Sequence, residues 1–122
     1  MIQYNLLHKI ITSFYDKAKK DILIGYHFRI IEDFDPHIVR ITDFWNLQLN
    51  GQIQDKSHLP FKLLEVHKEL KINKGEVFRW VKLFQENLEH YEANNEITLY
   101  QKEIWLQKVG LFRDKLLRFL NF

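Results

Sequence analysis

Apolar side chains recur at helical spacing through most of this chain. A spacing of three or four residues gathers side chains on one face of an α-helix, whereas a half-buried strand needs strict alternation. Residues 3–20 follow the helical spacing and therefore predict a helix that turns one face to the core. The members of this apolar stripe are Leu7, Ile10, Ile11, Phe14, Tyr15 and Ala18.

The same spacing returns in later segments. The 122 residues contain only four Gly and two Pro, which leaves little turn chemistry for a many-stranded sheet. The sequence therefore predicts an all-α fold, and its length predicts a single domain over residues 1–122. We expect a turn of helix or irregular chain over 22–28, helices over 36–49, 60–70, 74–92 and 96–120, and a polar loop over 51–59.

Local signals support these boundaries. Acidic residues followed by Pro36 predict a helix start, and Asn50-Gly51 predicts its end. The residues expected to face inward are Ile38, Ile41, Trp45 and Leu49; Leu63, His67 and Leu70; Val77, Trp80, Val81, Phe84 and Leu88; and Ile97, Tyr100, Ile104, Lys108, Leu111, Phe112, Leu116 and Phe119.

Composition excludes several functions. Without Cys, disulfides, thiolate zinc sites, iron–sulfur clusters and thiol nucleophiles are ruled out. No two of the six His are four residues apart, and Ser13 and Ser57 lie in no nucleophile motif. A Gly-rich phosphate loop is also missing. The sequence predicts no catalytic residue of these classes, and whether the protein is an enzyme stays open.

Charge and hydropathy point away from nucleic acid and membrane. The 18 basic and 16 acidic residues give a net charge of +2, and the basic run 17–20 is flanked by Asp16 and Asp21. Such a run is typical of a solvated helix end. No apolar run approaches the ~20 residues of a membrane span, and the N-terminus lacks a secretory pattern. We expect a cytoplasmic protein with no nucleic-acid or membrane partner.

A spread set of polar and aromatic residues is then left to explain. His37 and His67 lie on or beside apolar stripes, and large aromatics are directed to the same core; they are Tyr15, Phe28, Phe44, Trp45 and Trp80. An ordinary core with satisfied polar groups accounts for them, and so does the wall of a cofactor pocket. Periodicity alone leaves both interpretations open.

The order of three motif pairs resembles the group III truncated haemoglobins. Residues 14–16 (Phe-Tyr-Asp) and 24–28 (Ile-Gly-Tyr-His-Phe) look like that family's tyrosine-bearing helix and the Phe that packs against haem. Residues 33–37 (Asp-Phe-Asp-Pro-His) and 43–45 (Asp-Phe-Trp) look like its distal helix.

The third pair covers the proximal side. Residues 67–70 (His-Lys-Glu-Leu) and 78–84 (Phe-Arg-Trp-Val-Lys-Leu-Phe) look like the family's proximal His and tryptophan helix. The loop before His67 is longer than in typical members and lacks their Tyr-x-Gly, which makes His58 a rival iron ligand. His58 stands in a predicted loop, whereas His67 stands on a predicted helix, and His67 is preferred.

The resemblance implies a truncated globin fold, a helical sandwich around a haem pocket. It implies a b-type haem held without covalent bonds, with His67 as the axial ligand of iron. The other cofactor-binding residues that it implies are Phe28, Arg40, Ile41 and Phe44, with Arg40 a candidate for a haem propionate or a solvated charge. The distal, ligand-side residues that it implies are Tyr15, His37 and Trp80.

The resemblance also implies small ligands, namely dioxygen, carbon monoxide or nitric oxide. Hydrogen bonds from Tyr15 and Trp80 predict slow dioxygen release, which suits detoxification of nitric oxide or peroxide better than delivery. Turnover would need a separate reductase, and a carrier or sensor role stays open, as does the oligomeric state. The alternative function is a cofactor-free helical protein–protein interaction module, in which the inward His and Tyr are core polar groups.

Overall fold

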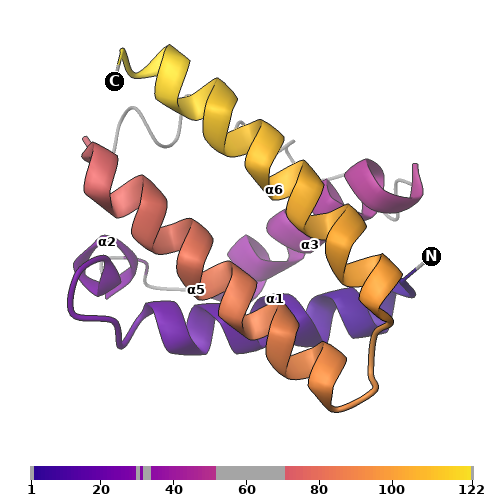
Figure 1. Ribbon diagram of the computed structural model, residues 1–122. Coiled ribbons are helices and arrows are strands. Elements are labelled where there is room, and N and C mark those ends of the chain that lie inside the picture. Colours follow the sequence, from indigo (N-terminus) through magenta and orange to yellow (C-terminus); the bar gives the residue numbers. More distant parts are fainter. Residues whose placement is uncertain (1, 30, 32–33, 52–70, 122) are drawn as a thin grey trace.

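The computed structural model describes residues 2–29, 31, 34–51 and 71–121, and no strand occurs in these ranges. The close helix pairs are α1–α3, α5–α6, α1–α5 and α3–α6. Figure 1 shows the α5–α6 pair crossing over α1 and α3. The all-α prediction is confirmed. The described helices are α1 (Tyr4–Ala18), α2 (Gly25–Arg29), α3 (Phe34–Asn50), α5 (Lys74–Ala93) and α6 (Leu99–Phe119).

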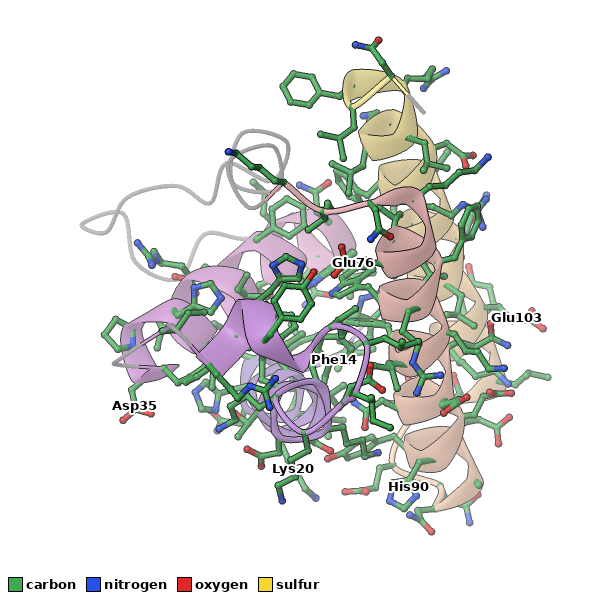
Figure 2. The ribbon with its side chains drawn as sticks, turned by 90° about the vertical axis from the view of Figure 1, so that its left-hand side faces the viewer. Phe14, Lys20, Asp35, Glu76, His90 and Glu103 are labelled. Atoms are coloured by element: carbon green, nitrogen blue, oxygen red, sulfur yellow. The ribbon has the colours of Figure 1, made fainter. Side chains whose placement is uncertain are left out.

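Helix α1 buries the whole stripe that its sequence predicted, from Leu7 to Ala18. Each large apolar side chain removed from water contributes about 1.5–3 kcal/mol, so this face holds α1 in the core. Figure 2 shows Phe14 pointing between the helices, whereas Lys20 and Glu103 project outward. The buried stripe fixes which face of α1, and so which side of Tyr15, meets the interior.

The turn after α1 is shaped by Asp21 and Gly25. Asp21 Oδ2 accepts hydrogen bonds from the backbone N–H groups of Leu23 and Ile24, at 3.0 and 3.2 Å. Gly25 lies so close to the chain behind it that a Cβ there would sit 2.7 Å from the Lys19 carbonyl oxygen. The close approach requires Gly at this position and allows α2 to start directly after the turn.

Helix α3 begins at Phe34, two residues before the predicted start at Pro36. The first four N–H groups of a helix have no partner within it, so Pro36 in the first turn sacrifices no hydrogen bond. The predicted end is confirmed, because Gly51 has φ +67° and its N–H donates to the Leu47 carbonyl at 3.0 Å. The predicted inward residues Ile38, Ile41 and Trp45 are buried.

Helices α5 and α6 each start with a capping box. Asn73 and Glu76 exchange side-chain and backbone hydrogen bonds at the start of α5, and Thr98 and Gln101 do so at the start of α6. These caps satisfy N–H groups that the helix cannot bond itself. Helix α5 matches its prediction closely, whereas α6 starts three residues later than the predicted residue 96.

The predicted core face of α6 is partly wrong. Tyr100 is 73% exposed and Leu111 is 52% exposed, although both were expected inward. The helix buries Trp105 and Val109, each one residue after a position that was predicted to face inward, Ile104 and Lys108. Apolar residues occur on several faces of α6. The face that packs against the core is the one that carries Trp105, whose ring centroid lies 5.7 Å from that of Trp45.

A buried amide joins α1 to α5. Asn87 is 1% exposed, and its Oδ1 accepts from Ser13 Oγ at 3.1 Å and from Lys17 Nζ at 2.7 Å. Its Nδ2 donates to the Ile10 carbonyl at 3.1 Å. These bonds fix the crossing of the two helices whose next turns carry Tyr15 and the pocket. Among the described helices, none has the length and hydropathy of a membrane span.

Candidate functional site

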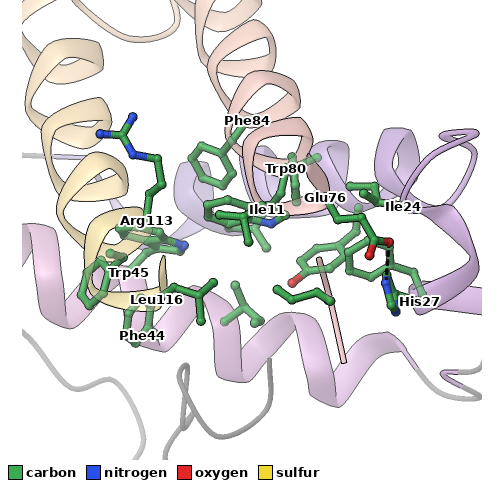
Figure 3. A pocket seen from close by; sticks show the side chains of 17 residues that line it. Ile11, Ile24, His27, Phe44, Trp45, Glu76, Trp80, Phe84, Arg113 and Leu116 are labelled. Atoms are coloured by element: carbon green, nitrogen blue, oxygen red, sulfur yellow. Dashed lines mark hydrogen bonds and ion pairs between the residues drawn. The ribbon is translucent and has the colours of Figure 1, made fainter. Parts of the chain in front are cut away.

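A pocket lies between α1, α2, α3, α5 and α6, with a volume of about 860 Å³ that includes the part open to solvent. Figure 3 shows its wall, with Trp80 and Phe84 from α5 facing Phe44 and Trp45 from α3. The lining is mainly apolar and aromatic. Such a lining, with a few polar groups among apolar and aromatic side chains, is typical of small-molecule and cofactor sites.

The structure brings five of the predicted site residues to this one pocket. Two of the predicted cofactor contacts come from α3, one from α2, and the two predicted hydrogen-bond donors come from α1 and α5. These residues are Ile41, Phe44, Phe28, Tyr15 and Trp80. Residues that are distant in sequence therefore converge on one cavity, which is the arrangement that a binding site needs.

Tyr15 is a buried residue that lines the pocket, at 6% exposure. Its hydroxyl makes no hydrogen bond within the described part of the chain. Burial raises the pKa of Tyr15 well above its ordinary value, so the group stays protonated and remains a donor at neutral pH. The hydroxyl is therefore available to donate a hydrogen bond to a ligand in the pocket.

Ring contacts hold Tyr15 in place. Its ring meets those of Phe28 and His37 edge to face, with centroids 5.4 Å apart in both cases. Such contacts contribute about 0.5–1.5 kcal/mol beyond burial and fix ring orientation. The Tyr15 hydroxyl is thus oriented by side chains from α2 and α3.

Two predicted site residues do not line the described wall. His37 is half-buried on α3 and touches the pocket indirectly, through its contact with the Tyr15 ring. Arg40 is also half-buried on α3, and its buried Nε has no hydrogen-bond partner among the described atoms. Helical spacing assigned the correct helix to both residues, but it does not give the direction in which a long side chain points.

Trp80 and Trp45 both belong to the aromatic wall. The centroid of the Trp80 ring lies 5.9 Å from that of Phe14 and 5.4 Å from that of Phe84, and the Trp80 side chain is half-buried. Trp45, which we expected to be a core residue, is 2% exposed and also lines the pocket. The core and the pocket wall are therefore one continuous aromatic cluster.

The sequence did not predict a buried His–Glu hydrogen bond at one end of the pocket. His27 Nε2 lies 2.7 Å from Glu76 Oε2, and both residues line the pocket at 8% exposure. Figure 3 shows the pair joined by a dashed line. Tyr26 donates to the same carboxylate oxygen, while the backbone N–H of Asn73 donates to Glu76 Oε1 at 2.9 Å.

These donors decide the charge of Glu76. Burial by itself would raise the pKa of the carboxyl group, but hydrogen bonds from Tyr26, Asn73 and His27 outweigh it and hold the pKa below its ordinary value. Glu76 is therefore ionised at neutral pH. The Asn73–Glu76 spacing in the sequence signals the capping box, but nothing local signals partners 49 and 50 residues away.

An ion pair between Asp21 and Arg79 ties the turn after α1 to α5. Arg79 donates to Asp21 Oδ1 from Nη2 at 2.6 Å and from Nε at 3.1 Å. These bonds, with the two backbone bonds of the turn, hold the pKa of Asp21 below its usual range. The turn that leads into α2 is therefore held against the same helix that carries Trp80.

The predicted iron ligand and its rival, His67 and His58, lie outside the described residues, as do the predicted loop over 51–59 and the helix over 60–70. Within residues 2–29, 31, 34–51 and 71–121, no group of three or more His, Cys, Asp or Glu side chains could hold a metal ion. The axial-ligand assignment stays a prediction.

Comparison with known proteins identifies the fold. No family model matches the chain, and no curated protein shows a significant match. Among solved structures, the chain is similar to a group III truncated haemoglobin from Campylobacter jejuni, with a TM-score of 0.79 and 25% identity. The match covers 98% of this chain and 92% of that protein. The chain has the truncated globin fold, in the form that a group III truncated haemoglobin adopts, as the order of its motifs predicted.

Proposed function

We propose that this protein is a haem-binding globin that takes dioxygen, carbon monoxide or nitric oxide as a small ligand. The observation that carries the proposal is the protonated, unpaired Tyr15 hydroxyl in a buried aromatic pocket. A hydroxyl that no described residue uses is free to donate to a ligand in the pocket. The similarity in fold supports the same assignment.

The pocket suits a flat hydrophobic cofactor. Phe28, Ile41 and Phe44 would pack against the macrocycle, and the absence of Cys from the sequence means that the haem would be held without thioether bonds. The Arg40 Nε has no hydrogen-bond partner among the described residues, and we assign the guanidinium to a haem propionate. His67 would give a ring-nitrogen lone pair to iron while its other ring N–H donates to a carbonyl.

A haem held by these residues would supply an iron atom that binds diatomic ligands. The surrounding residues would then decide how long a ligand stays. Tyr15 would donate a hydrogen bond to the ligand from its hydroxyl, and Trp80 would donate one from its indole N–H. His37 braces the Tyr15 ring through its edge-to-face contact and is a further donor or gate.

The strength of these bonds predicts the kind of function. A hydrogen bond that involves a charged or strongly polarised group contributes about 1.5–3 kcal/mol, and about 1.4 kcal/mol is a tenfold change in affinity. Each donor would thus slow ligand release roughly ten- to a hundredfold. Slow release suits removal of nitric oxide or peroxide in the cytoplasm, with electrons from a separate reductase, better than oxygen delivery.

The visible spectrum of the purified protein after haem supplementation tests the proposal. We expect a Soret band that is lost in His67→Ala and retained in His58→Ala. The reverse pattern would transfer the axial role to His58. Protein that stays colourless in every form would contradict the proposal and favour the cofactor-free interaction module.

A further inference from the structure

Helix α2 is attached to the rest of the described structure in an unusual way. It has five residues, Gly25–Arg29, and it is not a member of any of the close helix pairs. Yet it supplies His27 and Phe28 to the pocket wall. A helix this short has little stability of its own, so its position depends on the side-chain contacts that tether it.

The strongest tether is Glu76. One oxygen of its carboxylate accepts from both Tyr26 and His27 of α2, and the other accepts from the backbone of Asn73 at the start of α5. The carboxylate is buried and ionised, and its hydrogen bonds are charge-assisted, the stronger class. The Asp21–Arg79 pair adds a second tie, but it holds the turn before α2 and not α2 itself.

The tether joins two residues that matter to the pocket. Phe28 follows His27 directly, and its ring touches that of Tyr15. Trp80 follows Glu76 by one helical turn on α5, so the two share a face of that helix. Holding His27 against Glu76 therefore holds the Phe28 wall at a fixed separation from the Trp80 wall.

We propose that Glu76 is the positioning residue of this pocket: by binding Tyr26 and His27 it locks α2 to α5 and sets the spacing between Phe28 and Trp80 into which the cofactor fits. The inference rests on the proposed haem function for its consequence, since a loosened wall would let haem leave faster. The lock itself is present in the chain without any cofactor, and this allows the two ideas to be tested separately.

The first test measures the lock without haem. Because the chain has no Cys, spin labels can be attached to Cys introduced at Arg29 on α2 and at Gln85 on α5, both exposed in the structure. We expect a single narrow distance distribution in the parent protein, a broadened or shifted one in Glu76→Leu, and restoration of most of the narrow peak in Glu76→Gln, which keeps a hydrogen-bonding side chain. An unchanged distribution in Glu76→Leu would overturn the proposal.

A matched control separates the lock from the cap. Glu76 also closes the capping box of α5, and Gln101 occupies the same position in the capping box of α6, where it accepts from the Thr98 N–H at 2.8 Å. Gln101→Leu therefore loses an equivalent cap bond on a helix whose cap makes no contact with α2. If Gln101→Leu broadened the distances as much as Glu76→Leu, loss of a cap would explain the effect and the lock would be refuted.

The second test measures the consequence. In haem-loaded protein we expect Glu76→Leu to release haem to an acceptor protein at least about ten times faster, since the loss of a single hydrogen bond to a charged group already accounts for about that factor. Glu76→Gln, which keeps a hydrogen-bonding side chain but loses the charge, should release haem more slowly than Glu76→Leu, and Gln101→Leu should release it within about twofold of the parent rate. Haem release unchanged in Glu76→Leu would refute the positioning role. If the parent protein binds no haem, the proposed function fails, and the distance measurement still decides whether the lock exists.

Discussion

The Tyr15 hydroxyl ties stability to ligand binding, and Tyr15→Phe tests both at once. The substitution removes a hydroxyl oxygen that has no partner in the described structure and leaves the ring, whose centroid lies 5.3 Å from that of Phe14 and 5.4 Å from that of Phe28. Removing a polar group that has no protein partner from an apolar pocket recovers part of its desolvation cost, which is at most about 1–3 kcal/mol. We expect haem-free Tyr15→Phe to gain about 1 kcal/mol of unfolding free energy.

The same substitution should harm ligand retention. With the donor lost, the dioxygen dissociation rate of haem-loaded protein should rise roughly ten- to a hundredfold, which corresponds to about 1.5–3 kcal/mol. The assays are urea unfolding of the haem-free protein and stopped-flow ligand displacement. Tyr91→Phe is a suitable control. Tyr91, on α5, is buried like Tyr15 but does not line the pocket, so the dioxygen dissociation rate of this variant should stay at the parent value.

Two results would refute this reasoning. A fall of about 1 kcal/mol or more in the unfolding free energy of Tyr15→Phe would mean that the hydroxyl has a stabilising partner in the folded, haem-free protein. An unchanged dioxygen dissociation rate would mean that Tyr15 is not the donor. The gain in stability and the loss of ligand retention are expected together, because both come from one unpaired group.

Three further predictions concern the framework of the pocket. Asn87→Ala should lower the unfolding free energy by about 2–4 kcal/mol in urea titrations, because it breaks the buried bonds between α1 and α5; a loss below 0.5 kcal/mol would contradict that role. Asp21 and Glu76 have lowered pKa values in the folded protein, so the stability that they contribute is full above the ordinary carboxyl pKa of about 4 and is lost as the pH falls below it towards the folded-state values. Unfolding free energies at pH 7 and pH 3.5 should therefore differ less in Asp21→Asn than in the parent, and equal differences would refute this linkage. Gly25→Ala places a Cβ 2.7 Å from a carbonyl oxygen and should cost about 1–3 kcal/mol, which an unchanged urea midpoint would disprove.

The buried face of α1 could be predicted because its apolar residues recur at a regular helical spacing. The apolar spacing in α6 is less regular, and the predicted core face of that helix was partly wrong. In α1 the apolar residues occupy one face, so the stripe and the buried set agree. In α6 apolar residues surround the helix, and the choice of face depends on the Trp105 contacts with Trp45 and Phe84 from other helices. Such tertiary contacts are not encoded in local spacing, and Tyr100 was assigned inward for that reason.

The candidate site divides in the same way. Tyr15 and Trp80 were predictable because each lies on the apolar face of a regular helix and belongs to a motif whose order is specific. The His27–Glu76 pair joins residues 49 positions apart, and its partners come from a short helix without a periodic signal. Arg40 shows a different limit, because its backbone position was predicted but the direction of its long side chain was not.

The central claim is that the aromatic pocket binds one haem. Titration of haem into the purified haem-free protein tests this most directly, with the Soret absorbance and the Trp fluorescence followed together. We expect both signals to saturate at one haem per chain, because haem beside Trp80 would quench its emission, and we expect His67→Ala to bind haem more weakly. Absorbance that rises without saturation, with fluorescence unchanged, would contradict the claim.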